Sequence, residues 1–196
     1  MQLILASRSP RRQELLRNAG YVFEVRPSAV REERGPGETP EAFVRRLAVE
    51  KAQDVAARSA PGSLVLGADT EVVVDSDVLG KPADAEDAAQ MLRRLSGRCH
   101  QVVTGVCLVE APDRIQAVEH SSTQVWFRPL DEAEIRSYVA TGEPLDKAGA
   151  YGIQGLASRF VTRIEGCYFN VVGLPVALVD HLLRPFCELR QTHPTE

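Results

Sequence analysis

The sequence of 196 residues predicts an α/β protein built on a mixed sheet of parallel and antiparallel strands. Three observations lead to this prediction. Short apolar runs of strand composition are interspersed with segments of helical periodicity along the chain. Two long strand candidates, 100–110 and 114–127, flank a tight turn, which is typical of a hairpin. The strict strand–helix alternation of a Rossmann fold is not found, which favours a mixed sheet.

The N-terminal part of the chain opens with a short buried strand over 3–6. A helix is expected to follow, with Ser9 as its N-cap, Pro10 as its first residue and Gly20 just beyond its end. The further elements expected here, in chain order, are a strand over 21–25, a loop over 26–40, a helix opened by Thr39 and Pro40 with Phe43, Leu47 and Val55 on its buried face, and two strands within 63–75 separated by a polar interruption.

The remainder of the chain is expected to surround the long hairpin with helices. In chain order we expect a turn over 75–77, a helix over 85–95 that stops at Gly97, the hairpin, a helix from Asp131 to Ala140, a long loop or broken helix over 141–155, strands over 160–164 and 168–172, and a closing helix over 175–189. Residues 190–196 are expected to form a flexible tail. No repeat or low-complexity linker divides the sequence, so residues 1–189 are predicted to form a single domain.

Composition and charge argue against several classes of function. The net charge of −4 gives no overall attraction to nucleic acid, so an anion site requires local clustering of basic residues. No apolar run is long enough for a membrane span, and the apolar start is too short for a signal peptide, so a cytoplasmic location is expected. The cysteines and histidines do not fall at the spacing of a zinc site, and no Walker A pattern is present.

The segment LASRSPRRQELL places Arg11 and Arg12 in the first turn of the predicted helix. The free N–H groups there are already positive, so two guanidinium groups disfavour the helix unless an anion binds. A phosphate at this position would receive hydrogen bonds from the backbone, from Ser7 and Ser9, and from both arginines. The alternative is that both arginines point into solvent.

Asp69 ends the apolar run LVLGAD, which we expect to be the end of a strand. Reactive groups in α/β proteins are often found at such positions. The carboxylate could act as a general base on water or hold a divalent cation. A turn- or helix-capping aspartate without a chemical role is an equally good interpretation of the local sequence.

Other polar residues are open to two interpretations on local evidence. Lys81 lies on a turn constrained by Gly80 and Pro82, whereas Lys51 inside a helix is expected to be a solvated charge. Glu32 and its neighbour Glu33 lie in a charged loop, where solvation is the default and metal binding the alternative.

The loop DKAGAYGIQG contains further candidates for substrate contacts. Lys147 could meet a phosphate, and Gln154 could read a base edge through hydrogen bonds. Tyr151, and Phe169 further along the chain, could stack on a base, although such aromatic residues are more often part of the core.

Five segments together resemble the Maf family of nucleoside triphosphate pyrophosphatases. They are LASRSPRRQELL, GADTEVVVD, LGKPADAEDAAQMLRRLSGRCHQVVTGV, GEPLDKAGAYGIQG and NVVGLP. The resemblance extends from residue 3 to about residue 183 and implies an elongated, twisted sheet with helices in two lobes around a central cleft, similar to inosine triphosphatase. The AGAYGIQG segment resembles the branch that acts on dTTP and UTP, and modified pyrimidine nucleotides are also conceivable substrates.

The resemblance also implies roles for individual residues. Asp69 matches the proton acceptor of the family, and Glu32 matches an acidic position, so that Glu32 and Asp69 would hold Mg²⁺ or Mn²⁺. The positions matching the lining of the substrate site are Ser7, Arg11, Arg12, Lys51, Thr70, Lys81 and Gln154. Of these, Arg11, Thr70 and Gln154 match positions linked to base specificity.

The sequence also allows other functions. The family has also been linked to arrest of septum formation, so a nucleotide-binding regulator with little turnover is the main alternative. A pyrophosphatase for inosine or xanthosine triphosphate is a second, disfavoured by the SRSPRR and AGAYGIQG segments. We expect no nucleic acid or membrane partner, and a homodimer is plausible from the long hairpin and edge strands.

Overall fold

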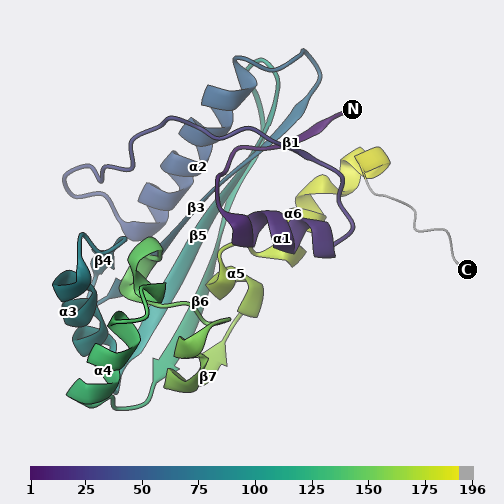
Figure 1. Ribbon diagram of the computed structural model, residues 1–196. Helices are drawn as coiled ribbons and strands as arrows, with labels where there is room; N and C mark the ends of the chain where they lie inside the picture. The colour runs from purple at the N-terminus through teal and green to yellow at the C-terminus, as the bar shows by residue number, and fades with distance from the viewer. Residues whose placement is uncertain (190–196) are drawn as a thin grey trace, which may run out of the picture. The chain divides into compact units, whose positions relative to one another are not determined.

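The computed structural model describes residues 1–189 and contains an α/β fold with a mixed sheet (Figure 1). The strands are β1 Leu3–Leu5, β2 Glu24–Val25, β3 Leu64–Val74, β4 Asp77–Leu79, β5 Cys99–Glu110, β6 Arg114–Phe127 and β7 Val161–Glu165. The α-helices are α1 Pro10–Asn18, α2 Pro40–Ala56, α3 Ala85–Leu95, α4 Glu132–Val139, α5 Tyr168–Val172 and α6 Val176–Leu183. Short 3₁₀ segments are η1 Glu143–Asp146, η2 Ala148–Ala150, η3 Leu156–Phe160 and η4 Arg184–Leu189.

The described strands form one sheet in the order β2-β1-β3-β5-β6-β7, with β4 paired to β3. Strand β1 is parallel to both β2 and β3, whereas the pairs β3–β4 and β6–β7 are antiparallel. The predicted mixed α/β sheet is therefore confirmed. The long hairpin of β5 and β6 is also confirmed, within one residue of its predicted bounds.

The chain divides into two compact units. The first unit contains Met1–Asp69, Thr104–Ser121 and the C-terminal segment from Gly173, and the second contains Thr70–Val103 and Ser122–Val172. The single domain over 1–189 stays a prediction, and the flexible tail predicted for residues 190–196 lies outside the described residues. No helix within residues 1–189 has the length and apolar character required to cross a membrane.

Helix α1 begins and ends as its sequence predicts. The Ser9 hydroxyl accepts a hydrogen bond from the Arg12 backbone N–H, and Pro10 is the first helical residue. At the other end, Gly20 has a φ of 82°, and the N–H groups of Gly20 and Tyr21 donate to the carbonyls of Arg17 and Leu16. This pair of bonds is the Schellman motif, which satisfies the last carbonyls of a helix.

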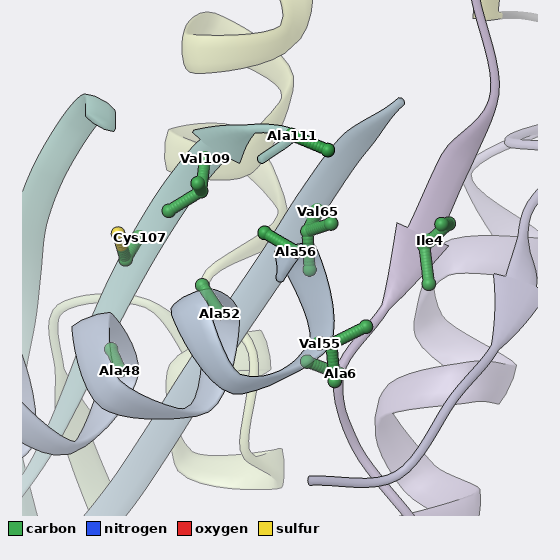
Figure 2. Close-up of a cluster of buried hydrophobic side chains, with 10 residues drawn as sticks. All are labelled: Ile4, Ala6, Ala48, Ala52, Val55, Ala56, Val65, Cys107, Val109 and Ala111. Atoms are coloured by element: carbon green, nitrogen blue, oxygen red, sulfur yellow. The ribbon is translucent and has the colours of Figure 1, made fainter. Parts of the chain in front are cut away.

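Helix α2 packs closely on the sheet of the first unit. Its residues Ala48, Ala52 and Ala56 lie over the strands that carry Val65 and Cys107, in a cluster of fully buried small and branched side chains (Figure 2). The approach is so close that a Cβ added at Gly67 of β3 would lie 2.2 Å from the Ala48 carbonyl oxygen. A Cβ at Gly105 of β5 would likewise lie 2.2 Å from the Val44 carbonyl oxygen. Glycine at these two strand positions is what allows α2 to lie this close.

We expect Gly105→Ala to lower the free energy of unfolding by about 3 kcal/mol, because backbone atoms of α2 must move to admit one methyl group. Chemical denaturation measures the change. Gly35→Ala is the matched control, since its added Cβ would lie 3.6 Å from its nearest neighbour, the Glu38 side chain. Wild-type stability of Gly105→Ala would contradict the close contact between helix and strand.

Two predicted elements were wrong. The interrupted pair of strands within 63–75 is one continuous strand, β3, followed by a tight hairpin to β4 in which Asp75 and Ser76 have positive φ. The strand predicted over 168–172 is the short helix α5. Its Asn170 amide donates to the Val102 carbonyl and the Thr123 hydroxyl, so tertiary hydrogen bonds override the strand preference of its valines and aromatics.

Other segments differ in extent. The strand expected over 21–25 is only the two-residue β2. The closing helix ends as α6 at Leu183 and continues as η4, because Pro185 cannot supply an α-helical N–H donor. The segment 141–155 agrees with its prediction as a long loop or broken helix, since η1 and η2 are separated by extended backbone at Lys147.

The second unit contains an aromatic core around His100. The centroid of the His100 ring lies 4.9 Å from that of Phe127 and 5.3 Å from that of Tyr151, and both pairs are edge to face. The His100 Nε2 atom lies 2.9 Å from the Tyr151 hydroxyl oxygen. Tyr151 is therefore a core residue, as one of the two interpretations predicted. Burial lowers the pKa of His100 from its ordinary value of 6.5 to about 4.

This shift predicts a pH dependence of stability. Between pH 6.5 and about 4 the unfolded chain binds a proton at His100 that the folded protein excludes, so the free energy of unfolding falls as pH decreases through this window. The contribution is about 3 kcal/mol over the window. Denaturation of wild type and His100→Gln across this range measures it, and the variant is expected to lose less stability. The exposed His120→Gln is the control, and equal slopes for wild type and His100→Gln would contradict the prediction.

Candidate active site

Three charged side chains meet in the first unit, and we call them the carboxylate–lysine cluster. The ammonium of Lys51, on α2, lies 2.5 Å from Asp69 Oδ1 on β3 and 2.5 Å from Glu32 Oε1 in the loop before α2. Lys51 and Asp69 are buried, at 7% and 4% exposed, whereas the Glu32 side chain is 42% exposed. One buried cation is therefore shared by a buried carboxylate and a carboxylate at the surface.

The second oxygen of Asp69 is not used by this ion pair. Asp69 Oδ2 is buried, and no donor among residues 1–189 gives it a hydrogen bond. A buried carboxylate oxygen without a donor is costly to the folded state and is often found at sites that bind a ligand or a cation. Asp69 Oδ2 is thus available to accept a proton or to coordinate a metal.

Arg12 joins the start of α1 to the same strand. Its guanidinium donates to the carbonyl of Ala68, next to Asp69 in the chain, at 2.8 Å and to the carbonyl of Gly173 at 2.9 Å. It also lies 3.3 Å from the buried Ser7 hydroxyl, which accepts a bond from the Ser9 N–H as well. The interpretation that Arg12 points into solvent is wrong, because three groups hold it against β3 and the first turn of α1. Arg11 is half-buried in that turn.

The loop that carries Glu32 is tied to α2 by Arg46. Its guanidinium forms a two-pronged pair with the Glu38 carboxylate, both bonds at 2.8 Å, and donates to the Glu33 carbonyl at 2.9 Å. The paired arginine holds the pKa of Glu38 at about 2. Because Glu33 directly follows Glu32, this bond fixes the backbone beside the surface carboxylate of the cluster.

Two predictions about these residues were wrong. Lys51 is not a solvated charge, since the small residues of α2 bring this face of the helix onto the sheet and bury the lysine with its partners. Asp69 is not at a strand end and caps no turn, since β3 continues for five residues beyond it. A strand buried on both sides shows no alternation that would mark its extent in the sequence.

The other candidate residues lie in the second unit. Thr70 is half-buried in β3, Lys81 is exposed on the turn after β4, and Gln154 is exposed between η2 and η3. The Gly149 N–H donates to the Gly80 carbonyl at 3.1 Å, so the turn of Lys81 and the loop before Gln154 are joined. The Lys147 ammonium donates at 2.6 Å to Glu143 O and to Asp146 Oδ1, which engages it within its own loop.

A comparison with protein families decides the membership of this chain. The model of the family described as Maf-like protein matches residues 2–186. The chain belongs to the Maf family. The resemblance found in the sequence is therefore confirmed over nearly the whole chain.

Named relatives are similar to this chain along nearly their whole length. A dTTP/UTP pyrophosphatase from Koribacter versatilis is 55% identical over 184 residues, which is 94% of each chain. One from Vibrio cholerae is 51% identical over 188 residues, covering 94% of this chain and 98% of the relative. Among solved structures, a HAM1 protein from Coxiella burnetii superposes with a TM-score of 0.53 at 16% identity, over 94% of this chain and 99% of that one. That likeness concerns the fold alone.

The carboxylate–lysine cluster has donors that suit a hard divalent cation. Glu32 Oε1 and Asp69 Oδ1 lie on either side of Lys51 Nζ, and Asp69 Oδ2 is available within the described part of the chain. Across residues 1–189 no group of three or more His, Cys, Asp or Glu side chains is arranged to hold a metal. Mg²⁺ is commonly bound by only one or two carboxylates together with substrate phosphates, so the two present fit such an ion.

Sequence reasoning missed Arg46 and Glu38. Their pairing spans eight residues and depends on the loop folding back over α2, which no local pattern indicates. The only available signal was the abundance of charge around residues 31–38, which is equally typical of a solvated loop.

Proposed function

We propose that this protein hydrolyses dTTP and UTP to the monophosphate and pyrophosphate. The buried Asp69 with an available Oδ2, beside Lys51 and next to the carbonyl that holds Arg12, is the observation that carries the proposal. The names of the Maf relatives, at about half identity along nearly their entire length, support the choice of substrate.

Charge makes this reaction slow without a catalyst. The triphosphate carries about four negative charges near neutral pH, which repel an attacking water from the α-phosphorus. Arg11, Arg12, Lys51 and Lys81 would screen this charge, and the Ser7 hydroxyl would bind a phosphate oxygen. The two arginines in the first turn of α1 then face an anion, which accounts for their placement at the positive end of a helix.

Asp69 is proposed as the base. Its free Oδ2 would accept the proton of the attacking water, while Oδ1 stays bound to Lys51 and fixes the orientation of the carboxylate. Glu32 and Asp69 would also hold the divalent cation, Mg²⁺ or Mn²⁺. When bound, that cation would supply positive charge beside the phosphates.

We assign base choice to Gln154, and the resemblance to the Maf family links Thr70 and Arg11 to base specificity as well. The Gln154 amide offers a donor and an acceptor, which together match the edge of uracil or thymine. With the amide held in one orientation, a base with the opposite pattern would leave these groups unsatisfied and would be rejected. The expectations of a cytoplasmic location, of a homodimer and of no nucleic acid or membrane partner stay predictions.

A substrate panel tests the proposal. Purified protein is assayed for pyrophosphate with dTTP, UTP, CTP, GTP and 7-methyl-GTP, each with Mg²⁺ and with Mn²⁺. We expect the highest kcat/KM with dTTP and UTP, and stoichiometric pyrophosphate with the monophosphate. Release of orthophosphate, fastest turnover of a guanine nucleotide, or tight binding without turnover would each contradict it, the last in favour of a nucleotide-binding regulator.

A further inference from the structure

Two side chains outside the proposed substrate contacts hold the segment Gly152–Leu156, at whose centre Gln154 lies. The hydroxyl of Tyr138, on α4, accepts a hydrogen bond from the Gly152 N–H at 3.2 Å. The Glu143 carboxylate, at the start of η1, accepts one from the Leu156 N–H at 3.1 Å through Oε2. The segment is thus anchored two residues before Gln154 and two residues after it.

The two anchors are themselves joined. The Tyr138 hydroxyl donates to Glu143 Oε1 at 2.9 Å, so both oxygens of the carboxylate are bonded. Tyr138 is fully buried, and burial together with the Glu143 bond raises the pKa of its hydroxyl. The hydroxyl therefore stays protonated and can donate to Glu143 while it accepts from the segment.

Glycines allow the segment to lie against these anchors. A Cβ at Gly155 would lie 2.3 Å from Glu143 Oε1, and one at Gly152 would lie 2.7 Å from the Lys147 side chain. The Gly155 N–H donates to the Gly152 carbonyl at 3.0 Å and closes a turn around Gln154. Both backbone and side chains thus fix the loop, while Gln154 itself is exposed.

We propose that Tyr138 and Glu143 are positioning residues for base selection, which they control by fixing the backbone on both sides of Gln154. The inference rests on the proposed function, in which Gln154 reads the base. Discrimination by hydrogen bonds requires a donor and an acceptor at fixed places, because a mobile amide can adapt to the wrong base. Tyr138 and Glu143 touch no substrate in this scheme and act only through the loop.

The test compares Tyr138→Phe and Glu143→Gln with wild type. The first removes the shared hydroxyl, and the second replaces one carboxylate oxygen by an NH₂ group that cannot accept a hydrogen bond. The readout is kcat/KM for UTP divided by kcat/KM for CTP, measured on one preparation. This ratio does not depend on the folded fraction, so partial unfolding cannot imitate the expected result. We expect the ratio to fall about tenfold in each variant, as for the loss of one well-placed hydrogen bond.

Two further measurements separate positioning from general stability. Tyr168→Phe and Glu165→Gln remove the same groups from exposed positions of the second unit and are expected to keep the wild-type ratio. In a Gln154→Ala background, Tyr138→Phe is expected to have no further effect on the ratio, because both changes act on one interaction.

Failure of this inference and failure of the proposed function give different results in these assays. If wild type is selective and both anchor variants keep its ratio while kcat/KM falls equally for UTP and CTP, the anchors only stabilise the fold and this inference is wrong. An additive effect of Tyr138→Phe in the Gln154→Ala background would overturn it as well. If wild type itself does not prefer UTP over CTP, the proposed function fails first, and this inference fails with it.

Discussion

Replacing Asp69 by Asn is expected to lower kcat by about 10²- to 10⁴-fold, the usual contribution of a positioned general base. The amide keeps the shape of the side chain but cannot take a proton from water. Its carbonyl can still accept from Lys51, and Glu32 stays beside the lysine, so the variant is expected to fold. Pyrophosphate release at saturating UTP measures the change, and circular dichroism verifies the fold.

Asp77→Asn is the matched control for this variant. It makes the same chemical change at an exposed carboxylate whose partner is Arg94 at the surface, and near wild-type kcat is expected. Near wild-type turnover by Asp69→Asn would remove Asp69 from the role of base. A normal kcat restored only by raised metal concentration would assign Asp69 to the cation alone.

Lys51→Met is expected to have the largest effect on stability. Methionine fills a similar volume but leaves Asp69, 4% exposed, as a buried carboxylate without its cation. Breaking one side of a buried ion pair costs about 3–5 kcal/mol, because the remaining charge is not compensated. Urea denaturation at neutral pH measures the loss. Arg45→Met, an exposed position on the same helix, is expected to change stability little.

The double variant Lys51→Met with Asp69→Asn tests the cause. If the uncompensated carboxylate is responsible, removing its charge recovers most of the lost stability, and the two changes are strongly non-additive. Additive losses would mean that lost packing around the lysine stem, rather than charge, dominates.

The predictions for Asp69→Asn and Lys51→Met both depend on the buried pair of Lys51 and Asp69. The same lysine that pairs with the buried Asp69 carboxylate also leaves its second oxygen without a partner among the described residues. Because Lys51 stands on α2, its position depends on the close approach of the helix at Gly67 and Gly105. Gly67 and Gly105 therefore help to determine where the ammonium group of Lys51 lies.

Elements with local signals were predictable. Ser9 at the start of α1, Gly20 at its end and Asp131 at the start of α4 each satisfy backbone groups within a few residues, and Pro10 has no N–H that needs a partner, so their sequence is sufficient. The β5–β6 hairpin is equally local. The helix α5 was not predictable, because Asn170 fixes it through bonds to Val102 and Thr123, distant in the chain.

The five sequence motifs were sufficient to recognise the Maf family, because their residues and their order along the chain are specific. The resemblance implied that Glu32 and Asp69 share a cation and that Lys51 lines the substrate site, but it did not show that the lysine is buried between the two carboxylates. Local evidence even favoured a solvated Lys51, since a lysine after a glutamate in a helix is ordinarily exposed.

The sequence by itself determined the helix caps, the turns, the β5–β6 hairpin and the family. The first three depend on residues that are neighbours in the chain, and the family was recognised from its sequence motifs. Only the tertiary structure decided that Lys51 is buried between two carboxylates, that Asp69 lies inside a strand with one oxygen available, and that the anchors Tyr138 and Glu143 hold the Gln154 segment. The physical reason is that burial and hydrogen bonding between residues distant in the chain exist only after helices and strands have packed.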